Sequence, residues 1–310
     1  MKIMKFGGTS VGKPERMRQV AQLITANDEL KIVVLSALSG TTNALVFIGD
    51  NIALGDRVAA KRKIDELEAH YRNFVQELLQ VKEMQDKANA IVTEHFEFLN
   101  IILKISFSEA LSKDILAQGE LMSTRLFSVY LEEKNVDHML LPALEFMSID
   151  GNEEPQIGSI KVKLTQLIKQ HNKKIYITQG YICRNVRGEV DNLKRGGSDY
   201  TASLIAAAVK ADVCEIWTDI DGMHNNDPRV VNKTVPVELL SFDEAAELAY
   251  FGAKILHPAC IWPAQLYNVP VKLLNTMQPL AKGTTIQEGA EGSGAKAVAA
   301  KDGIIAINVK

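Results

Sequence analysis

The sequence has few cysteines and no long hydrophobic run, and both absences exclude classes of protein. Its three cysteines, Cys183, Cys214 and Cys260, lie far apart and show none of the paired spacings of zinc sites. They predict a protein of a reducing compartment, and we expect the cytoplasm. No apolar stretch reaches the roughly 18 residues that span a bilayer, and no signal-peptide core follows the N-terminus. We therefore expect no membrane partner.

The sequence also lacks an excess of charge of one sign. Its 35 Lys and Arg residues against 38 Asp and Glu residues give a formal net charge of −3. This balance argues against a nucleic-acid partner, because such proteins present a basic face. The hydrophobic share of 46% and the charged share of 24% are ordinary for a globular protein. A chain of 310 residues is long enough for one large or two medium domains.

The apolar residues form short runs that alternate with helical patterns. Most runs are nearly continuous and rich in valine and isoleucine, which is typical of strands that helices cover on both faces. Alternating strands and helices predict an α/β fold with a mostly parallel sheet, in which ligands bind beyond the carboxyl ends of the strands. The expected strands are Lys2–Phe6, Ile32–Ser36, Ile175–Thr178, Val213–Trp217, Val269–Leu273 and Ile304–Val309.

Two segments depart from this alternation. Residues 56–105 carry apolar side chains at helical spacing among many Lys, Glu, Gln and Ala residues, which predicts two or three amphipathic helices inserted into the α/β domain. Residues 289–294, Gly-Ala-Glu-Gly-Ser-Gly, predict a linker after a main domain of residues 1–288. The apolar run that follows predicts the start of another unit over residues 295–310.

The most informative motif follows the first expected strand. That strand carries Lys5, and the turn after it begins Gly-Gly-Thr, where glycines let the backbone approach a ligand and the first amides of a helix bind phosphate. The spacing of this turn with Lys13 also matches a P-loop, but Pro14 stands where a P-loop needs the Ser or Thr that binds Mg²⁺. We therefore expect a phosphate site that depends on Lys5, with an unliganded turn as the alternative.

Two further polar segments have both a binding and a structural interpretation. Residues 36–43, Ser-Ala-Leu-Ser-Gly-Thr-Thr-Asn, follow the second expected strand and either donate hydrogen bonds to a small anion or cap the next helix. Glu120 lies near the start of an expected helix, where it either interacts favourably with the helix dipole or binds an ammonium group. The residues alone leave these alternatives open.

A second pair of glycines precedes a helix of small residues. Arg195 comes directly before Gly196 and Gly197 and is suited to a bidentate pair with a carboxylate or phosphate. Asp199 follows and would order a lysine or a metal, with a structural salt bridge as the alternative.

The polar segments after residue 217 complete the set. Residues 217–222, Trp-Thr-Asp-Ile-Asp-Gly, and 227–229, Asp-Pro-Arg, offer partners for a ribose or a phosphate, or form an ordinary loop. Farther on, Ser241–Glu244 predicts a capping box at the start of a helix, and Lys254 is a candidate phosphate ligand. We expect His257, which precedes a proline, to be structural.

Taken together, these segments resemble the aspartate kinases of the amino-acid kinase family. They occur in the order of the family and extend to about Ile286. The sequence Gly-Glu-Leu-Met-Ser-Thr at 119–124 and Glu-Ala-Ala-Glu at 244–247 look most like the monofunctional, lysine-sensitive branch. The segments that carry the resemblance are 5–11, 39–43, 119–124, 195–200, 217–222 with 227–229, and 251–254 with 257–258.

The resemblance implies a fold and a reaction. The fold is a three-layer αβα sandwich with a mostly parallel central sheet, as in carbamate kinase. The reaction transfers the γ-phosphoryl group of MgATP to the β-carboxylate of L-aspartate and gives 4-phospho-L-aspartate and ADP, the first step towards lysine, threonine and methionine. The attacking carboxylate is already ionised at neutral pH, so that no general base is required.

The resemblance also implies roles for single residues. Lys5 would neutralise charge on the transferring phosphoryl group, and Asp199 would position Lys5 or organise the metal; no dedicated protein metal site is expected. Glu120 would bind the ammonium group of aspartate and Arg195 its α-carboxylate, and the other expected substrate residues are Ser39, Thr42 and Ser198. The expected ATP-binding residues are Lys5, Gly7, Gly8, Thr9, Thr218, Asp219, His224 (a position commonly occupied by tyrosine in the family), Arg229 and Lys254.

Members of the family usually carry two ACT regulatory domains after the kinase domain. Residues 295–310 resemble only the opening strand of the first, so we expect this chain to lack normal feedback inhibition by lysine or threonine. A homodimer is expected for the full-length form.

Two other functions compete with this interpretation. One is another amino-acid kinase, acting on glutamate, N-acetylglutamate or a nucleoside monophosphate; the pair of Glu120 and Arg195 favours a free α-amino acid instead. The other is a non-catalytic amino-acid-binding sensor, which would not need so many phosphate-facing residues. A Rossmann oxidoreductase is disfavoured because no G-x-G-x-x-G follows the first strand.

Overall fold

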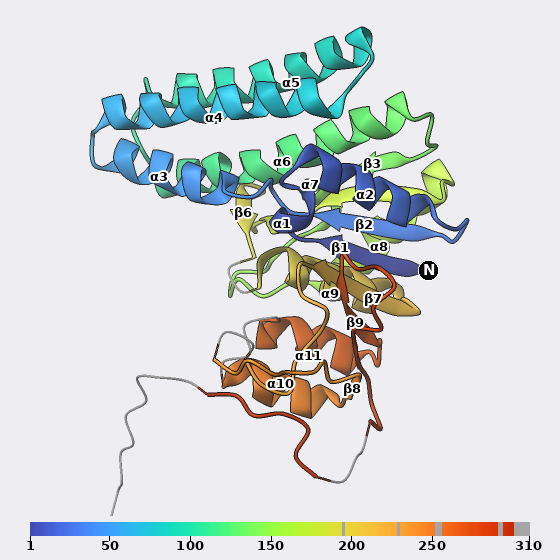
Figure 1. The fold of residues 1–310 in the computed structure, drawn as a ribbon. Helices are drawn as coiled ribbons and strands as arrows, with labels where there is room; N and C mark the ends of the chain where they lie inside the picture. Colours follow the sequence, from blue (N-terminus) through green and yellow to red (C-terminus); the bar gives the residue numbers. More distant parts are fainter. Residues whose placement is uncertain (194–195, 228–229, 252–255, 291–293, 301–310) are drawn as a thin grey trace, which may run out of the picture.

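The computed structural model describes residues 1–193, 196–227, 230–251, 256–290 and 294–300. A sheet of eight strands runs through the molecule in the order β3-β4-β2-β1-β7-β9-β10-β8 (Figure 1). Every neighbouring pair is parallel except β9 and β10. These strands are β1 (Lys2–Phe6), β2 (Lys31–Leu35), β3 (Met139–Leu141), β4 (Ile175–Gln179), β7 (Val213–Thr218), β8 (Leu239–Leu240), β9 (Val271–Asn275) and β10 (Thr284–Ile286), and β5 (Ile182–Arg184) and β6 (Val190–Asn192) form a separate antiparallel pair.

Helices connect the strands and cover the sheet. Their bounds are α1 (Gly8–Val11), α2 (Pro14–Thr25), α3 (Thr41–Ala53), α4 (Arg57–Leu78), α5 (Lys82–Ile102), α6 (Glu109–Glu133), α7 (Ala143–Phe146), α8 (Ile157–His171), α9 (Gly197–Val209), α10 (Phe242–Tyr250) and α11 (Pro258–Leu266). The expected capping box between Ser241 and Glu244 is confirmed, and Pro14 is the first residue of α2. Among the described ranges, no helix combines the length and the apolarity needed to cross a bilayer.

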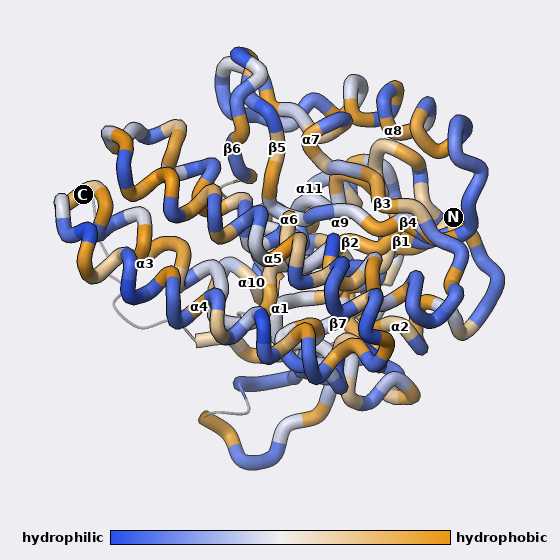
Figure 2. Tube along the Cα trace, turned by 90° about the horizontal axis from the view of Figure 1, so that it is seen from above, coloured by the Kyte–Doolittle hydropathy of each residue, from blue (hydrophilic) through white to orange (hydrophobic). Residues whose placement is uncertain are grey.

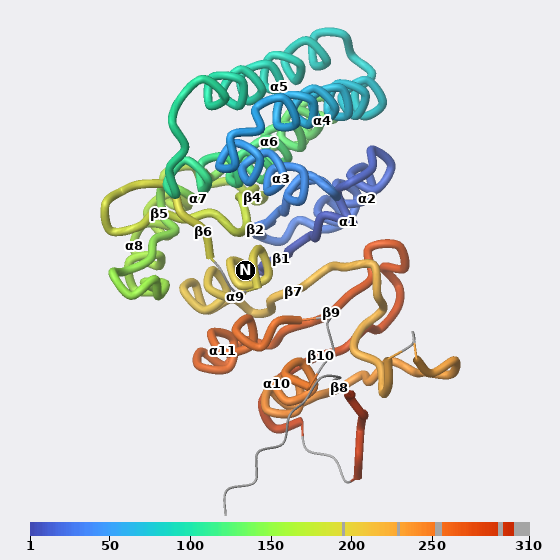
Figure 3. Tube along the Cα trace, turned by 90° about the vertical axis from the view of Figure 1, so that its left-hand side faces the viewer, coloured from blue at the N-terminus to red at the C-terminus, as the bar shows by residue number. Residues whose placement is uncertain are grey.

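The two faces of the sheet are covered by different helices, because side chains alternate along a strand. In β1, Met4 and Phe6 pack into a cluster with α2, α3 and α6, whereas Ile3 joins a cluster with α8, α9 and α11. Figure 3 shows these helix layers on either side of β1 and β2. The expected three-layer αβα architecture with a mostly parallel sheet is therefore confirmed.

Helices α4 and α5 add a further layer on one side. They occupy most of residues 56–105 and pack on α3 and α6, so that the four helices form a bundle above the sheet (Figure 1). Hydrophobic and hydrophilic residues alternate along α4 with helical spacing (Figure 2). The apolar face of α4 is buried at Ala60, Ile64, Leu67, Tyr71, Phe74, Val75 and Leu78. The insertion is thus amphipathic and helical, as its pattern predicts.

Five of the six expected strands correspond to β1, β2, β4, β7 and β9, with ends that differ by up to two residues. The sixth, Ile304–Val309, lies outside the described residues. The strands β3, β5, β6, β8 and β10 were not expected from the sequence, because each has only two or three residues.

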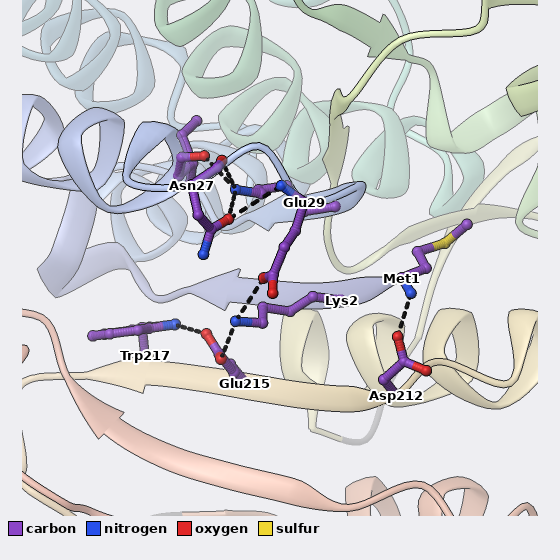
Figure 4. Close-up of polar contacts among 9 residues, drawn as sticks. Met1, Lys2, Asn27, Glu29, Asp212, Glu215 and Trp217 are labelled. Carbon is purple, nitrogen blue, oxygen red and sulfur yellow. Dashed lines mark hydrogen bonds and ion pairs between the residues drawn. The ribbon is translucent and has the colours of Figure 1, made fainter.

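Charged side chains join the amino ends of the central strands, at the edge of the sheet opposite to the glycine turns (Figure 4). The Lys2 ammonium lies 3.1 Å from the Glu215 carboxylate and 3.2 Å from that of Glu29. The Glu215 carboxylate also accepts a hydrogen bond from the Trp217 indole at 2.9 Å. The amino group of Met1 pairs with Asp212. These contacts fasten β1, β7 and the loop before β2 to one another.

Candidate active site

The carboxyl ends of the central strands lie at one level. Phe6 of β1 is in register with Leu35 of β2 and with Trp217 of β7. Backbone hydrogen bonds then join the segments that follow: the Gly7 amide donates to the Trp217 carbonyl at 3.3 Å, and the Ser36 amide donates to the Phe6 carbonyl at 3.2 Å. The polar segments predicted from the sequence after these strands therefore lie side by side.

Lys5 and Asp199 form the charged contact at this edge. The Lys5 ammonium lies 2.6 Å from Asp199 Oδ1, and the Lys5 residue is only 9% exposed. Asp199 belongs to the first turn of α9, directly after the second pair of glycines. A methyl group at Gly7 would come within 3.3 Å of Lys5 Nζ. Glycine at that position therefore keeps the space beside the ammonium group free.

The first glycine turn packs against the turn after β2. The carbonyl of Gly7 accepts hydrogen bonds from the Ser10 and Val11 amides, and the first amides of a helix have no acceptor within it. Gly8 lies against the backbone of Ala37, since a Cβ at Gly8 would be 3.0 Å from the Ala37 carbonyl oxygen. This close approach directs the Gly8 and Thr9 backbone toward the turn that carries the predicted substrate residues.

Glu120 is buried behind that turn, in the middle of α6 and not near the start of a helix as expected, so the dipole at a helix N-terminus does not explain its place. It is 3% exposed, and its Oε1 accepts a hydrogen bond from the Ala37 amide at 3.2 Å. Its Oε2 has no hydrogen-bond partner among the described residues. Burial raises the pKa of Glu120 to about 7, and the Ala37 hydrogen bond opposes part of that shift. A buried carboxyl with an unused oxygen is suited to an incoming cation, such as a substrate ammonium group.

Gly119 lets helix α6 reach this turn. A Cβ at Gly119 would stand 2.8 Å from Ala37 Cβ and 3.3 Å from Thr41 Cγ2. Four residues along the same helix face, the Ser123 hydroxyl donates to the Ser36 carbonyl at 2.8 Å. Helix α6 and the turn after β2 therefore hold Glu120 from two sides.

The second glycine turn, at the start of α9, packs against the residues that follow β4. Ser198 is 7% exposed and packs against Gly180, where a Cβ would lie only 2.2 Å from the Ser198 hydroxyl. The next residue, Tyr181, has a φ of 69°, a conformation that is strained for a bulky side chain and that occurs often at functional sites. Its amide donates to the Thr201 hydroxyl at 2.8 Å. The Tyr181 ring lies against the second glycine turn, since a Cβ at Gly197 would be 3.9 Å from Tyr181 Cδ2. Burial, together with the charge of Glu120, raises the pKa of Tyr181 to about 12.

The predicted nucleotide residues follow β7. Thr218 donates to the Asp219 carboxylate at 3.1 Å, and Asp219 is exposed. Both ring nitrogens of His224 are engaged, with Asp221 Oδ1 at 2.7 Å and with the Thr234 hydroxyl at 2.7 Å. These two contacts hold the His224 ring within the loop that follows β7.

The remaining predicted site residues are placed as follows. Ser39 and Thr42 are exposed on the turn after β2. Arg195, Arg229 and Lys254 lie outside the described residues. His257 caps α11, where its Nδ1 accepts a hydrogen bond from the Ala259 amide at 3.1 Å. The expectation that His257 is structural is therefore confirmed.

Two tyrosines at the site were not among the residues predicted from the sequence. Nothing in the sequence marked Tyr181 as a site residue apart from its place after the strand β4. Tyr71 was visible only as one apolar position in the stripe of an amphipathic helix, although its hydroxyl lies 3.0 Å from Thr41 Oγ1. The apolar stripe of a helix predicts which side chains are buried, but it does not predict which buried hydroxyl contacts a residue of the site.

The described residues contain no group of three or more His, Cys, Asp or Glu that could hold a metal ion by themselves. Mg²⁺ is usually bound by one or two carboxylates together with phosphate oxygens and water. The single carboxylate of Asp199 beside Lys5 fits that mode of binding, in which the nucleotide supplies most of the ligands.

Comparison with known proteins fits this geometry. The model of the amino acid kinase family matches residues 1–275. The chain belongs to the amino acid kinase family. It is 34% identical to lysine-sensitive aspartokinase 3 of Escherichia coli over 288 residues, which is 92% of this chain and 63% of that protein. It is 37% identical to the chloroplastic aspartokinase 3 of Arabidopsis thaliana, over 92% of this chain and 52% of that protein.

A solved structure of a family member agrees with the fold. The crystal structure of E. coli aspartokinase III in complex with aspartate and ADP has a TM-score of 0.83 with this chain at 33% identity. The alignment covers 94% of this chain and 65% of that structure's chain. The chain thus spans less than two thirds of the length of these relatives.

Proposed function

We propose that this chain is the catalytic part of an aspartate kinase, which transfers the γ-phosphoryl group of ATP to the β-carboxylate of L-aspartate. The observation that carries the proposal is the ion pair between Lys5 and Asp199, 2.6 Å long, which joins the two glycine turns at one edge of the sheet. The similarity to aspartokinases over 92% of the chain supports the choice of substrate.

The residues divide the chemical task between them. The β-carboxylate of aspartate is ionised at neutral pH, so its oxygen attacks the γ-phosphorus directly and ADP leaves. Lys5 stabilises negative charge on the phosphoryl group, and Asp199 holds the Lys5 ammonium in place. Asp199 would also contribute one ligand to the Mg²⁺ that ATP brings, which supplies further charge neutralisation. Glu120 receives the substrate ammonium group.

The remaining assignments belong to the same proposal. Ser39, Thr42, Arg195 and Ser198 complete the aspartate site, and Gly7, Gly8, Thr9, Thr218, Asp219, His224, Arg229 and Lys254 bind the nucleotide. Residues 1–288 form the catalytic domain, 289–294 a linker and 295–310 the start of an ACT domain. The protein acts in the cytoplasm, in keeping with three buried, free cysteines, and is a homodimer at full length.

The test is an assay of ADP release by the chain with ATP and Mg²⁺, with hydroxylamine added to trap any acyl phosphate. We expect release that depends on L-aspartate and accumulation of the hydroxamate. L-glutamate, N-acetyl-L-glutamate and UMP form the comparison panel. Turnover of one of these instead of aspartate would assign the chain to another branch of the family, and aspartate binding without turnover would favour a sensor.

The role of Lys5 has a matched control in the same segment. Lys5→Ala is expected to lower kcat by roughly 10²–10³-fold, because it removes a group that stabilises the transition state. Lys13→Ala removes an exposed lysine at the position where a P-loop would carry its phosphate ligand, and we expect its kcat to stay within about twofold of wild type. The opposite pattern would mean that the phosphate site is built on Lys13.

A further inference from the structure

The inserted helix α4 reaches the proposed substrate site through one hydroxyl group. Tyr71 lies in the middle of α4 and is completely buried, with its ring centroid 5.9 Å from that of Phe96 in α5. Its hydroxyl lies 3.0 Å from Thr41 Oγ1. Figure 1 shows why this contact is possible, since α4 lies directly over α3, which begins at Thr41.

Thr41 is the residue of the turn after β2 that contacts Tyr71. It is 1% exposed, and its amide donates to the Leu38 carbonyl at 3.0 Å, which closes the turn. Its neighbour Gly40 has a φ of 82°, a left-handed conformation that glycine adopts readily and that lets the chain turn into α3. The side chain of Thr41 is therefore held inside the protein, whereas that of Thr42, the next residue, is exposed.

The same turn controls the position of Glu120. The Ala37 amide donates to Glu120 Oε1, and Gly119 brings α6 into contact with both Ala37 and Thr41. Burial raises the pKa of Tyr71 above its ordinary value, and the charge of Glu120 raises it further. The tyrosine therefore keeps its proton and lies within electrostatic reach of the carboxylate that would receive the substrate ammonium group.

We propose that Tyr71 is a positioning residue for the amino-acid substrate: its hydrogen bond to Thr41 holds the turn of residues 36–43, and thereby Glu120 and Thr42, in the conformation that binds aspartate. The inference rests on the proposed aspartate kinase function and adds to it. The inserted helices then have a part in substrate recognition, although none of their side chains is expected to touch the substrate.

The test compares Tyr71→Phe with wild type. Losing one buried hydrogen bond is expected to raise the KM for aspartate by about threefold to tenfold, while the KM for ATP changes by less than about twofold. A merely structural role would lower the melting temperature and the active fraction without this difference between the two substrates. An unchanged KM for aspartate, or equal changes for both substrates, would overturn the proposal.

The chain offers a matched control. Tyr176 is also completely buried, and its hydroxyl donates to the Ile168 carbonyl at 3.0 Å and accepts from the Lys173 amide at 2.8 Å. It faces the other side of the sheet, among the residues packed on α8 and α9. Tyr176→Phe should therefore affect stability and leave both KM values unchanged. A rise in the KM for aspartate in this variant as well would mean that loss of any buried hydroxyl has this effect.

A double-mutant cycle locates the effect in the contact itself. Thr41→Val removes the same hydrogen bond from the other side, whereas Thr41→Ser keeps a hydroxyl. We expect the effects of Tyr71→Phe and Thr41→Val on aspartate affinity to be strongly non-additive, and Thr41→Ser to resemble wild type. Additive effects would overturn the proposal.

Calorimetric titration with aspartate measures the dissociation constant of aspartate for wild type and for each variant, and so makes the same comparison without turnover. It tests the contact even if the wild-type chain shows no turnover, a result that would count against the proposed function and not against Tyr71.

Discussion

Glu120 illustrates how one side chain at this site depends on its surroundings. Near the surface its carboxyl would be ionised at neutral pH, but burial raises its pKa to about 7. A bound ammonium group would restore the ionised form by supplying the opposite charge. Without substrate, the neutral carboxyl avoids the desolvation cost of a buried charge. With substrate, the ionised carboxylate attracts the ammonium group strongly.

Aspartate binding is expected to depend on pH through this residue. As the pH rises from 6 to 8, the ionised fraction of Glu120 rises about tenfold, so the KM for aspartate should fall by a similar factor. Glu120→Gln should raise the KM and remove this dependence. Steady-state kinetics over that range measure both, and a KM that is flat with pH in wild type would contradict the role of Glu120.

The same carboxyl predicts a change in stability without ligand. Its pKa is raised in the folded protein, so its contribution is fully present below the unfolded value of about 4.5 and is lost as the pH rises through about 7. The melting temperature of wild type should therefore fall relative to that of Glu120→Gln over this interval. Thermal unfolding of the two proteins at matched pH values gives the comparison.

At the scale of secondary structure, glycines decide how closely the elements approach. Gly119 allows α6 to pack closely against the turn after β2. Gly180, which follows β4, allows Ser198 of α9 to pack against the backbone there. Both glycines have ordinary backbone conformations as far as φ is concerned, so the reason for glycine is space and not left-handed geometry. The site is therefore formed by contacts between elements, and each contact tolerates little additional volume.

Gly119→Ala is expected to push α6 away from the turn. The new methyl group would stand 2.8 Å from Ala37 Cβ, which cannot rotate away. We expect a loss of stability of about 1–3 kcal/mol and a higher KM for aspartate. Gly49→Ala is the control, because its Cβ would meet only Ile115 Cδ1 at 4.0 Å within helix α3, and this variant should gain about 0.5–1 kcal/mol. Chemical denaturation measures both, and similar effects of the two substitutions would refute the steric argument.

At the scale of the whole molecule, the residues at the carboxyl ends and at the amino ends of the central strands have different roles. The former edge of the sheet is called here the carboxyl edge and the latter the amino edge. The carboxyl edge holds the glycine turns, Lys5 and Glu120. The amino edge holds charged residues whose contacts are with one another, with backbone carbonyls and with the polar groups of Asn27 and Trp217. Lys31 is the most buried of them, at 1% exposed, and its ammonium donates to the Ile24 carbonyl at 2.8 Å and to both the backbone and side-chain oxygens of Asn27. It fastens the end of α2 to β2.

Lys31→Met should therefore separate stability from activity. The buried Ile24 carbonyl and two partly buried Asn27 oxygens would lose their donor, which is expected to cost about 1–3 kcal/mol of unfolding free energy. The kcat and both KM values should remain those of wild type, because the site is at the opposite edge. Lys63→Met, at a half-buried surface lysine paired with Glu66, should change stability by less than about 0.5 kcal/mol. A lower kcat in Lys31→Met below its unfolding transition would show that the two edges are coupled.

The sequence by itself determined the class of fold and the segments that carry the site. Continuous apolar runs such as Ile32–Leu35 predict buried parallel strands because both faces of such strands lose water. Glycine pairs mark turns because only glycine allows the close approach. These are local properties of the sequence, and from them β1, β2, β4, β7 and β9 could be predicted. They missed β3, β8 and β10, whose two or three residues depend on pairing with a neighbour.

Only the tertiary structure decided which segments meet. The register of Phe6 with Leu35 and Trp217 brings three turns together, and the ion pair of Lys5 with Asp199 joins residues that are far apart in the chain. The approach of Tyr71 to Thr41 was equally hidden, because a residue on an apolar helical stripe looks the same whether its hydroxyl meets solvent, core or site. Periodicity encodes which face is buried, and packing between distant elements decides what that face touches.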